Sequence, residues 1–309
     1  MIHRMAYFVV LLFSVPLMAD DGQTAREWLE RMSLAIKHVN YQGTLVYGGR
    51  THWETLAVHH AVIDGVEHEK LLHLTGDPRA IIRHGAKNDD RNPSPANPLT
   101  QGLIHASADL SAVYELSLGD QQRIAGRMAQ QINIMTRDRY RYSYRLWLDT
   151  STALLLASEL LNLEGQTLER LQFADVEIGH DIPRATFEPD DQAHFTAMPV
   201  QSLQDDQHDS LQQWHANWLP RGFSVASQSV REDEQQRLIT RMYSDGLAAF
   251  TVFVHFEQEP SMPSMVRQWG ATTAVVRYQA HEQQQVRIAV VGEIPKFTAE
   301  KIASSITRP

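Results

Sequence analysis

The 309-residue sequence contains no cysteine. This absence excludes disulfides, thiol catalysis and thiolate metal sites, and it also excludes a lipid anchor on an N-terminal cysteine. Basic residues are in the minority, with 28 Lys and Arg against 37 Asp and Glu and a net charge of −9. Nucleic-acid binding depends on neutralising phosphates, so nucleic acid is not expected as the main partner. The acidic balance leaves room for a basic peptide or protein partner.

The first nineteen residues have the three parts of a secretory signal. Basic Arg4 precedes an apolar run from Met5 to Val15, and the small residue Ala19 stands before Asp20. The run is shorter than the about 20 apolar residues of a membrane-spanning helix, and Ser14 interrupts it. We therefore predict cleavage after Ala19 and export to the periplasm.

Catalytic motifs are also missing. The sequence has neither G-x-S-x-G nor G-x-x-x-x-G-K-[ST], so it signals no nucleophile elbow and no P-loop. The sequence has fifteen histidines, which raises the question of a metal site. His68 and His73, however, are five apart on an expected strand and point to opposite faces. Adjacent His59 and His60 diverge in the same way. We predict a protein that is not an enzyme, with no catalytic residues, no metal site and no cofactor.

The residues after the signal predict one helix followed by many strands. Residues 24–39 have apolar side chains at helical spacing, and Thr24 with Glu27 forms a plausible capping box. Meandering strands follow, with Asp64-Gly65 as a hairpin turn. The expected strands are 41–47, 53–63, 66–74, 79–83, 112–118, 123–125, 129–136, 139–149, 153–163 and 167–178, with a polar excursion over 84–109. This order predicts an α+β fold whose N-terminal domain, residues 20–180, is a half-open antiparallel β-barrel over a helix.

A second domain follows a polar linker. Residues 181–212 have weak periodicity and are predicted to be the linker, and residues 213–309 form a smaller α+β domain. Its expected strands are 238–244, 247–257, 272–279 and 285–291, with a turn at Asp245-Gly246. A last helix is expected over 298–306, with Thr298 as its N-cap.

One strand has two interpretations. From Arg139 to Leu148, tyrosines and leucines alternate with arginines. The tyrosines either line a lipid cavity or form a core face, and the arginines either meet anionic groups or form a solvated face. The following strand, 154–163, is apolar on both faces, so the extra face must be covered by a helix, another domain or a hydrophobic ligand.

Six segments together resemble the MucB/RseB family of periplasmic anti-sigma-factor regulators. They are YQGTLVY (41–47), RYSYRLWLD (141–149), EGQTLE (164–169), WLPRGF (218–223), YSDGL (243–247) and VVGEIP (290–295). The resemblance covers essentially the whole chain after the signal and is weakest over 87–109. It implies an N-terminal domain shaped like the lipoprotein carriers LolA and LolB, followed by a linker and a smaller domain.

The resemblance also implies a function. Members bind the periplasmic part of a MucA- or RseA-type anti-sigma factor and shield it from site-1 proteolysis, and lipopolysaccharide or lipoprotein acyl chains displace them under envelope stress. Homo-oligomers are expected. The alternative is a periplasmic lipid or lipoprotein carrier of the LolA/LolB type. The candidate partner-binding residues are Trp218, Phe223, Tyr243, Asp245, Leu247 and Phe250, although a plain hairpin turn and core aromatics explain them as well. The candidate lipid-binding residues are Trp28, Arg139, Tyr140, Arg141, Tyr142, Tyr144, Arg145 and Leu156.

Overall fold

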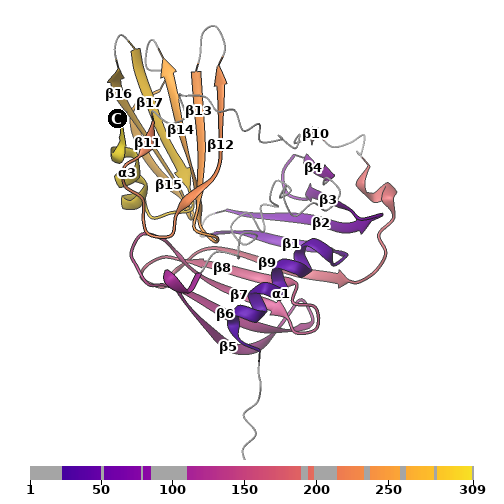
Figure 1. Ribbon diagram of the computed structural model, residues 1–309. Helices are drawn as coiled ribbons and strands as arrows, with labels where there is room; N and C mark the ends of the chain where they lie inside the picture. Colours follow the sequence, from indigo (N-terminus) through magenta and orange to yellow (C-terminus); the bar gives the residue numbers. More distant parts are fainter. Residues whose placement is uncertain are drawn as a thin grey trace, which may run out of the picture.

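The chain builds two separate large β-sheets (Figure 1). The computed structural model describes residues 23–49, 52–77, 79–84, 110–188, 194–197, 214–232, 237–257, 262–281 and 284–307. The predicted signal peptide and nearly all of the 84–109 excursion lie outside these residues. No helix in the described ranges has both the length and the apolar character needed to cross a bilayer.

The first helix, α1 (Ala25–His38), begins where the sequence predicts. The Thr24 hydroxyl accepts from the Glu27 N–H at 3.3 Å, and the Glu27 carboxylate accepts from the Thr24 N–H at 2.7 Å. This reciprocal pair confirms the capping box. One face of α1 is buried in a core cluster with side chains of β5 to β8, and it includes Trp28 and Met32.

The N-terminal sheet has ten strands in the order β10-β4-β3-β2-β1-β9-β8-β7-β6-β5. Neighbours are antiparallel except β10 and β4, which are parallel. The two edge strands do not pair with each other, so the sheet is unclosed, as the α+β half-open barrel predicts. The strands are β1 (Tyr41–Gly49), β2 (Trp53–Ile63), β3 (Val66–His73), β4 (Arg79–His84), β5 (Tyr114–Ile124), β6 (Arg127–Thr136), β7 (Ser143–Asp149), β8 (Leu155–Leu161), β9 (Thr167–Ile178) and β10 (His194–Ala197).

The C-terminal sheet has six strands in the order β12-β13-β14-β17-β16-β15. Helix α3 (Lys296–Ser305) packs against β16 and β17. It begins two residues before the predicted start, because Pro295 occupies the N-cap position and Thr298 lies inside the first turn. The strands are β11 (His215–Ala216), β12 (Ser224–Glu232), β13 (Arg237–Ser244), β14 (Ala249–Glu257), β15 (Met265–Trp269), β16 (Thr272–His281), β17 (Gln284–Gly292) and β18 (Ile306–Thr307).

The sequence did not predict five strands, β10, β11, β12, β15 and β18, because none of them has a clear apolar alternation. The edge strands β12 and β15 are mostly polar or exposed, and β11 is only two residues long. In the predicted linker, β10 pairs with β4, and the 3-10 turn η2 (Arg184–Phe187) buries Phe187. Part of the expected linker is therefore ordered structure.

The predicted strand 139–149 is wrong at its start, because β7 begins only at Ser143. The Asp138 carboxylate accepts from the Tyr140 N–H at 2.8 Å, and the Thr136 hydroxyl accepts from the Asp138 N–H at 3.2 Å. These side-chain bonds form a bend that overrides the tyrosine–arginine alternation. Residues 139–142 therefore lie in a loop, from which Arg141 reaches the C-terminal sheet.

Strand β8 is buried on both faces by the protein itself. Leu155 and Leu160 belong to the cluster that contains α1, whereas Leu156 and Ala157 belong to a second cluster with Trp147. The apolar residues on its second face are thus covered by side chains of neighbouring strands and need no ligand.

Candidate functional site

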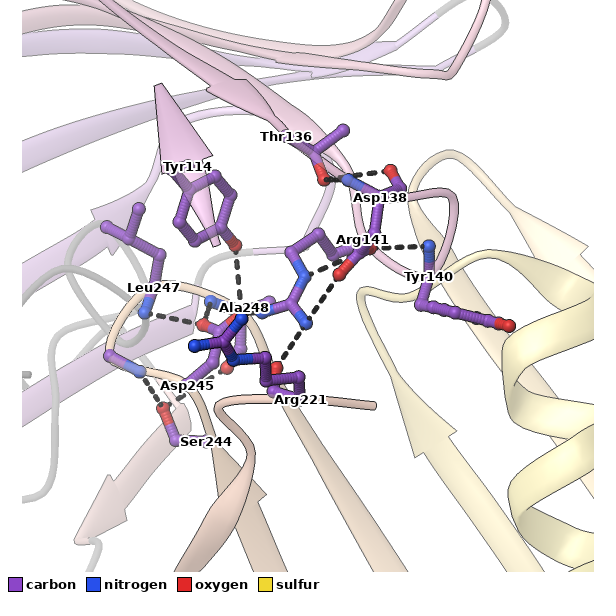
Figure 2. A network of polar contacts seen from close by, with 11 residues as sticks. Tyr114, Thr136, Asp138, Tyr140, Arg141, Arg221, Ser244, Asp245, Leu247 and Ala248 are labelled. Carbon is purple, nitrogen blue, oxygen red and sulfur yellow. Dashed lines mark hydrogen bonds and ion pairs between the residues drawn. The ribbon is translucent and has the colours of Figure 1, made fainter. Parts of the chain in front are cut away.

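The joint between the two sheets contains several of the residues predicted to bind the partner. The turn between β13 and β14 projects into the N-terminal part (Figure 2). Asp245 Oδ1 accepts from the Leu247 and Ala248 N–H groups at 3.0 and 2.8 Å, which closes the turn. Its other oxygen, Oδ2, accepts from the Tyr114 hydroxyl at 3.0 Å and from the Arg141 guanidinium. Asp245 is therefore both a turn residue and the polar link between the sheets.

Arg141 lies wholly inside this joint. Its side chain is 0% exposed, and it donates to Asp245, to the Arg221 carbonyl and to Asp138. Its guanidinium also lies 5.0 Å from the centre of the Phe223 ring. Burial by itself lowers the pKa of Arg141, but the Asp245 carboxylate and the other partners outweigh it and raise that pKa. The joint thus holds a buried, charged ion pair.

Tyr114 supplies the neutral donor of the network. Burial, followed by the Asp245 carboxylate, raises the pKa of its phenol well above the ordinary value. The hydroxyl therefore stays protonated and donates a hydrogen bond to Asp245.

Apolar contact reinforces the polar link. Leu247, at the tip of the turn, and Ala271, in the turn between β15 and β16, are both buried in the core cluster that contains α1. Two side chains of the C-terminal part therefore complete the core of the N-terminal part.

A second contact is centred on Glu169 of β9. Its carboxylate accepts from the Ala271 N–H at 2.7 Å and from the Tyr47 hydroxyl at 2.6 Å. Gly270 has φ of +58°, and a Cβ there would stand 2.1 Å from Glu169 Oε1. Glycine suits this position, because the left-handed backbone conformation disfavours other residues and a Cβ would displace the Glu169 carboxylate from Ala271.

Glu293, after β17, adds a carboxyl group near Glu169. Burial among surrounding atoms, then the Glu169 carboxylate, raises the pKa of Glu293 to about 7. Much of the Glu293 side chain nevertheless remains accessible to solvent. Solvent screening therefore limits the free energy linked to this shift.

Replacing Glu293 with glutamine is expected to flatten the pH dependence of stability between about pH 4.5 and 7. Because the folded pKa is raised, the protonated carboxyl stabilises the fold below the unfolded value, and this contribution is lost as pH rises through the folded value. We expect about 1 kcal/mol or less, after allowing for screening. Urea unfolding of both proteins across this range measures the difference. If the free energies of unfolding of the two proteins change in parallel from pH 4.5 to 7, the raised pKa of Glu293 is wrong.

A third contact joins aromatic rings and cations. The Tyr140 ring lies 5.1 Å from Trp218 and 5.8 Å from Phe297. Lys301 Nζ lies 3.9 Å from the centre of the Trp218 ring, and Arg139 lies over Phe297 at 4.6 Å. The loop before β7 thereby touches both α3 and the segment before β12.

The predicted partner-binding residues separate into two groups. Tyr243, Phe223 and Phe250 are core residues of the C-terminal sheet, with the rings of Tyr243 and Phe250 stacked at 5.1 Å. Asp245 and Leu247 are buried in the joint, and Trp218 is half-buried beside it. The structure supports the core interpretation for Tyr243 and Phe250. Phe223 belongs to the same core but also contacts Arg141 at the joint, where the other three residues lie.

The predicted lipid-binding residues do not form one surface. Trp28, Tyr142 and Tyr144 are buried together in the α1 cluster, but Leu156 lies in the other cluster. The expected solvated arginine face is wrong for Arg141, which is buried at the joint. Arg145 pairs with Glu159, and Arg139 stacks on Phe297.

Sequence reasoning missed Tyr114, Glu169, Ala271 and Glu293 as joint residues. Glu169 and Glu293 stand inside segments that carry the family resemblance, so a signal for both was present. Nothing local marks Tyr114, since its partner Asp245 is 131 residues away. Within the described residues, no group of three or more His, Asp or Glu is placed to hold a metal ion.

Comparison with known proteins shows to which family this chain is related. The MucB/RseB N-terminal domain matches residues 24–191, and the MucB/RseB C-terminal domain matches residues 208–307. The sigma factor AlgU regulatory protein MucB of Pseudomonas aeruginosa is 32% identical, over 96% of this chain and 94% of its own. The sigma-E factor regulatory protein RseB of Escherichia coli is 29% identical, with the same coverage.

A solved structure has the same overall architecture. The complex of MucA and MucB from Pseudomonas aeruginosa aligns with a TM-score of 0.73 and 28% identity, covering 92% of this chain and 98% of that one. Both sheets therefore have counterparts in a structure that was solved with MucA. From the matches to both of its domains and the near full-length relatives, the chain belongs to the MucB/RseB family.

Proposed function

We propose that this protein binds the periplasmic part of a MucA- or RseA-type anti-sigma factor, shields it from site-1 proteolysis and so restrains a sigma factor. The observation that carries this proposal is the near full-length relationship to MucB, whose structure in complex with MucA has the same two-sheet architecture. The relatives are regulatory proteins, and their names describe no enzyme.

The proposed location is the periplasm, with export directed by residues 1–19. The basic start, the apolar run and Ala19 support this assignment. Detection of a mature N-terminus at Asp20 in a periplasmic extract tests both the signal and its cleavage site. Self-association is a further expectation, which sedimentation of the purified mature chain measures.

Release of the partner by lipid is proposed to act through the joint. Trp28, Tyr142 and Tyr144 share one buried cluster with Leu247 of the C-terminal part. An acyl chain of lipopolysaccharide or lipoprotein that entered this cluster would compete with Leu247 and loosen the joint. Lipid can displace the partner only if it binds the loosened arrangement better than the docked one.

A protease-protection assay tests the function. The anti-sigma periplasmic domain is incubated with its site-1 protease, with and without the purified mature protein. We expect slower cleavage in the presence of the protein and faster cleavage again after lipopolysaccharide is added. Unchanged cleavage, together with recovery of lipoproteins but no anti-sigma factor from envelope extracts, would favour the carrier function instead.

Deletion of the gene gives the cellular counterpart of this assay. Transcription from the envelope-stress promoters is expected to rise, because the anti-sigma factor loses its protection. Unchanged transcription, both at rest and under lipid stress, would contradict the regulatory function.

A further inference from the structure

A cationic and aromatic surface crosses the joint beside α3. We call it the ledge; its core is Arg139 and Tyr140 from the loop before β7, and Trp218, Phe297 and Lys301 from the C-terminal part. Lys301 Nζ lies 5.5 Å from the Tyr140 ring centre in addition to its 3.9 Å contact with Trp218. The ledge therefore exists as one surface only while the two sheets are docked.

The cations of the ledge and its flanks have no direct ion-pair partner within the described residues. Arg139 and Lys301 are exposed, as are Arg221 and Lys296, which flank Trp218 and Phe297 in sequence. None of the four forms an ion pair within the described part of the chain. Two acids stand nearby in sequence. Asp138 shares buried Arg141 with Asp245, at 3.0 Å from the guanidinium. Glu300 is four residues after Lys296 on the same side of α3, so it offsets the charge of Lys296 and leaves Arg139, Lys301 and Arg221 as the main cations.

This local charge is opposite in sign to that of the whole chain, whose net charge is −9. At physiological salt, exposed charges are screened beyond about 8 Å. A narrow ligand lying on the ledge therefore meets mainly its cations. An anionic bilayer is a broad plane and also meets the acidic remainder of the surface. The rings of Tyr140, Trp218 and Phe297 are only partly exposed, so they present little that can insert into a bilayer.

We propose that the ledge binds an extended acidic segment of the anti-sigma partner. Carboxylates of the segment pair with Arg139, Lys301 and the flanking cations, and an apolar side chain packs on the aromatic rings. This inference rests on the proposed function and names the chemistry of its partner. Because both sheets contribute to the ledge, the bound segment stabilises the docked arrangement.

Charge reversal of the ledge tests this assignment. The double variant Arg139→Glu/Lys301→Glu is compared with the unmodified protein for binding of the periplasmic domain of the organism's own anti-sigma factor by calorimetry. We expect at least about tenfold weaker binding and a shallower dependence of affinity on salt, because surface charge pairs lose strength with salt. The milder variant Arg139→Gln/Lys301→Met keeps the aliphatic stems over the rings. Its affinity is expected to depend on salt as weakly as that of the double glutamate variant.

Arg123→Glu/Arg231→Glu is the matched control. It changes the net charge equally, at exposed positions on β5 and β12, and should leave affinity within about twofold. An unchanged salt dependence in both ledge variants overturns the inference while the proposed function stands. Failure of the unmodified protein to bind the domain overturns both. If the ledge variants instead lose binding to vesicles made of equal parts phosphatidylcholine and phosphatidylglycerol, while peptide binding is unaffected, the surface serves a membrane and the peptide assignment is wrong.

Discussion

Replacing Arg141 with methionine is expected to destabilise the protein by about 3 kcal/mol, because the buried Asp245 carboxylate loses its cation. Asp245→Asn is expected to cost less, because the guanidinium loses its buried carboxylate but still pairs with Asp138 at 3.0 Å. Asparagine keeps an oxygen that can accept from the Leu247 and Ala248 N–H groups, so the turn itself is preserved. Urea unfolding of the single variants measures both losses.

The double variant separates the ion pair from its surroundings. Arg141→Met/Asp245→Asn removes both charges, so its cost should be clearly smaller than the sum of the single costs. Arg145→Met is the control from the same segment, since Arg145 pairs with Glu159 and is 38% exposed, and it should cost less than about 1 kcal/mol. If Arg141→Met costs no more than this control, the buried pair does not hold the joint.

Truncating Leu247 to alanine is expected to cost about 2–5 kcal/mol, because the side chain fills the core beneath α1 from the other part of the chain. The two sheets should also separate more readily, which small-angle scattering detects as a larger radius of gyration. If the joint holds the partner-binding arrangement, affinity for the anti-sigma domain falls in parallel.

Leu163→Ala is the matched control for this substitution. Leu163 is 44% exposed after β8, so its truncation should stay within about 0.5 kcal/mol and leave the scattering unchanged. A loss of stability in Leu247→Ala with unchanged scattering would mean that the leucine supports its own hairpin rather than the joint.

Together these contacts describe a joint of mixed chemistry. The Arg141–Asp245 pair supplies orientation, because truncating either partner leaves a buried charge, while Leu247 and Ala271 supply apolar contact. Glu169, cradled by Gly270, adds a backbone hydrogen bond at the second contact. A regulator that must hold a partner and release it needs two arrangements of similar free energy.

Local chemistry allowed the sequence to predict much of this fold. Thr24 and Glu27 are three residues apart and cap their own helix, so the start of α1 could be read from the sequence. Asp64-Gly65 and Asp245-Gly246 form turns through their own backbone preferences. The same logic failed at Arg139, because the Asp138 and Thr136 side chains bend a segment whose alternation indicates a strand.

The sequence by itself determined most of the elements, the α+β class and the family resemblance, since each depends on neighbouring residues or on the order of segments. Only the tertiary structure decided what Arg141 and Asp245 do. They are 104 residues apart, and no local pattern distinguishes a buried interdomain pair from a solvated arginine and a turn aspartate. Their roles arise because two sheets, each folded for its own local reasons, bring a loop and a hairpin tip together and exclude water from both.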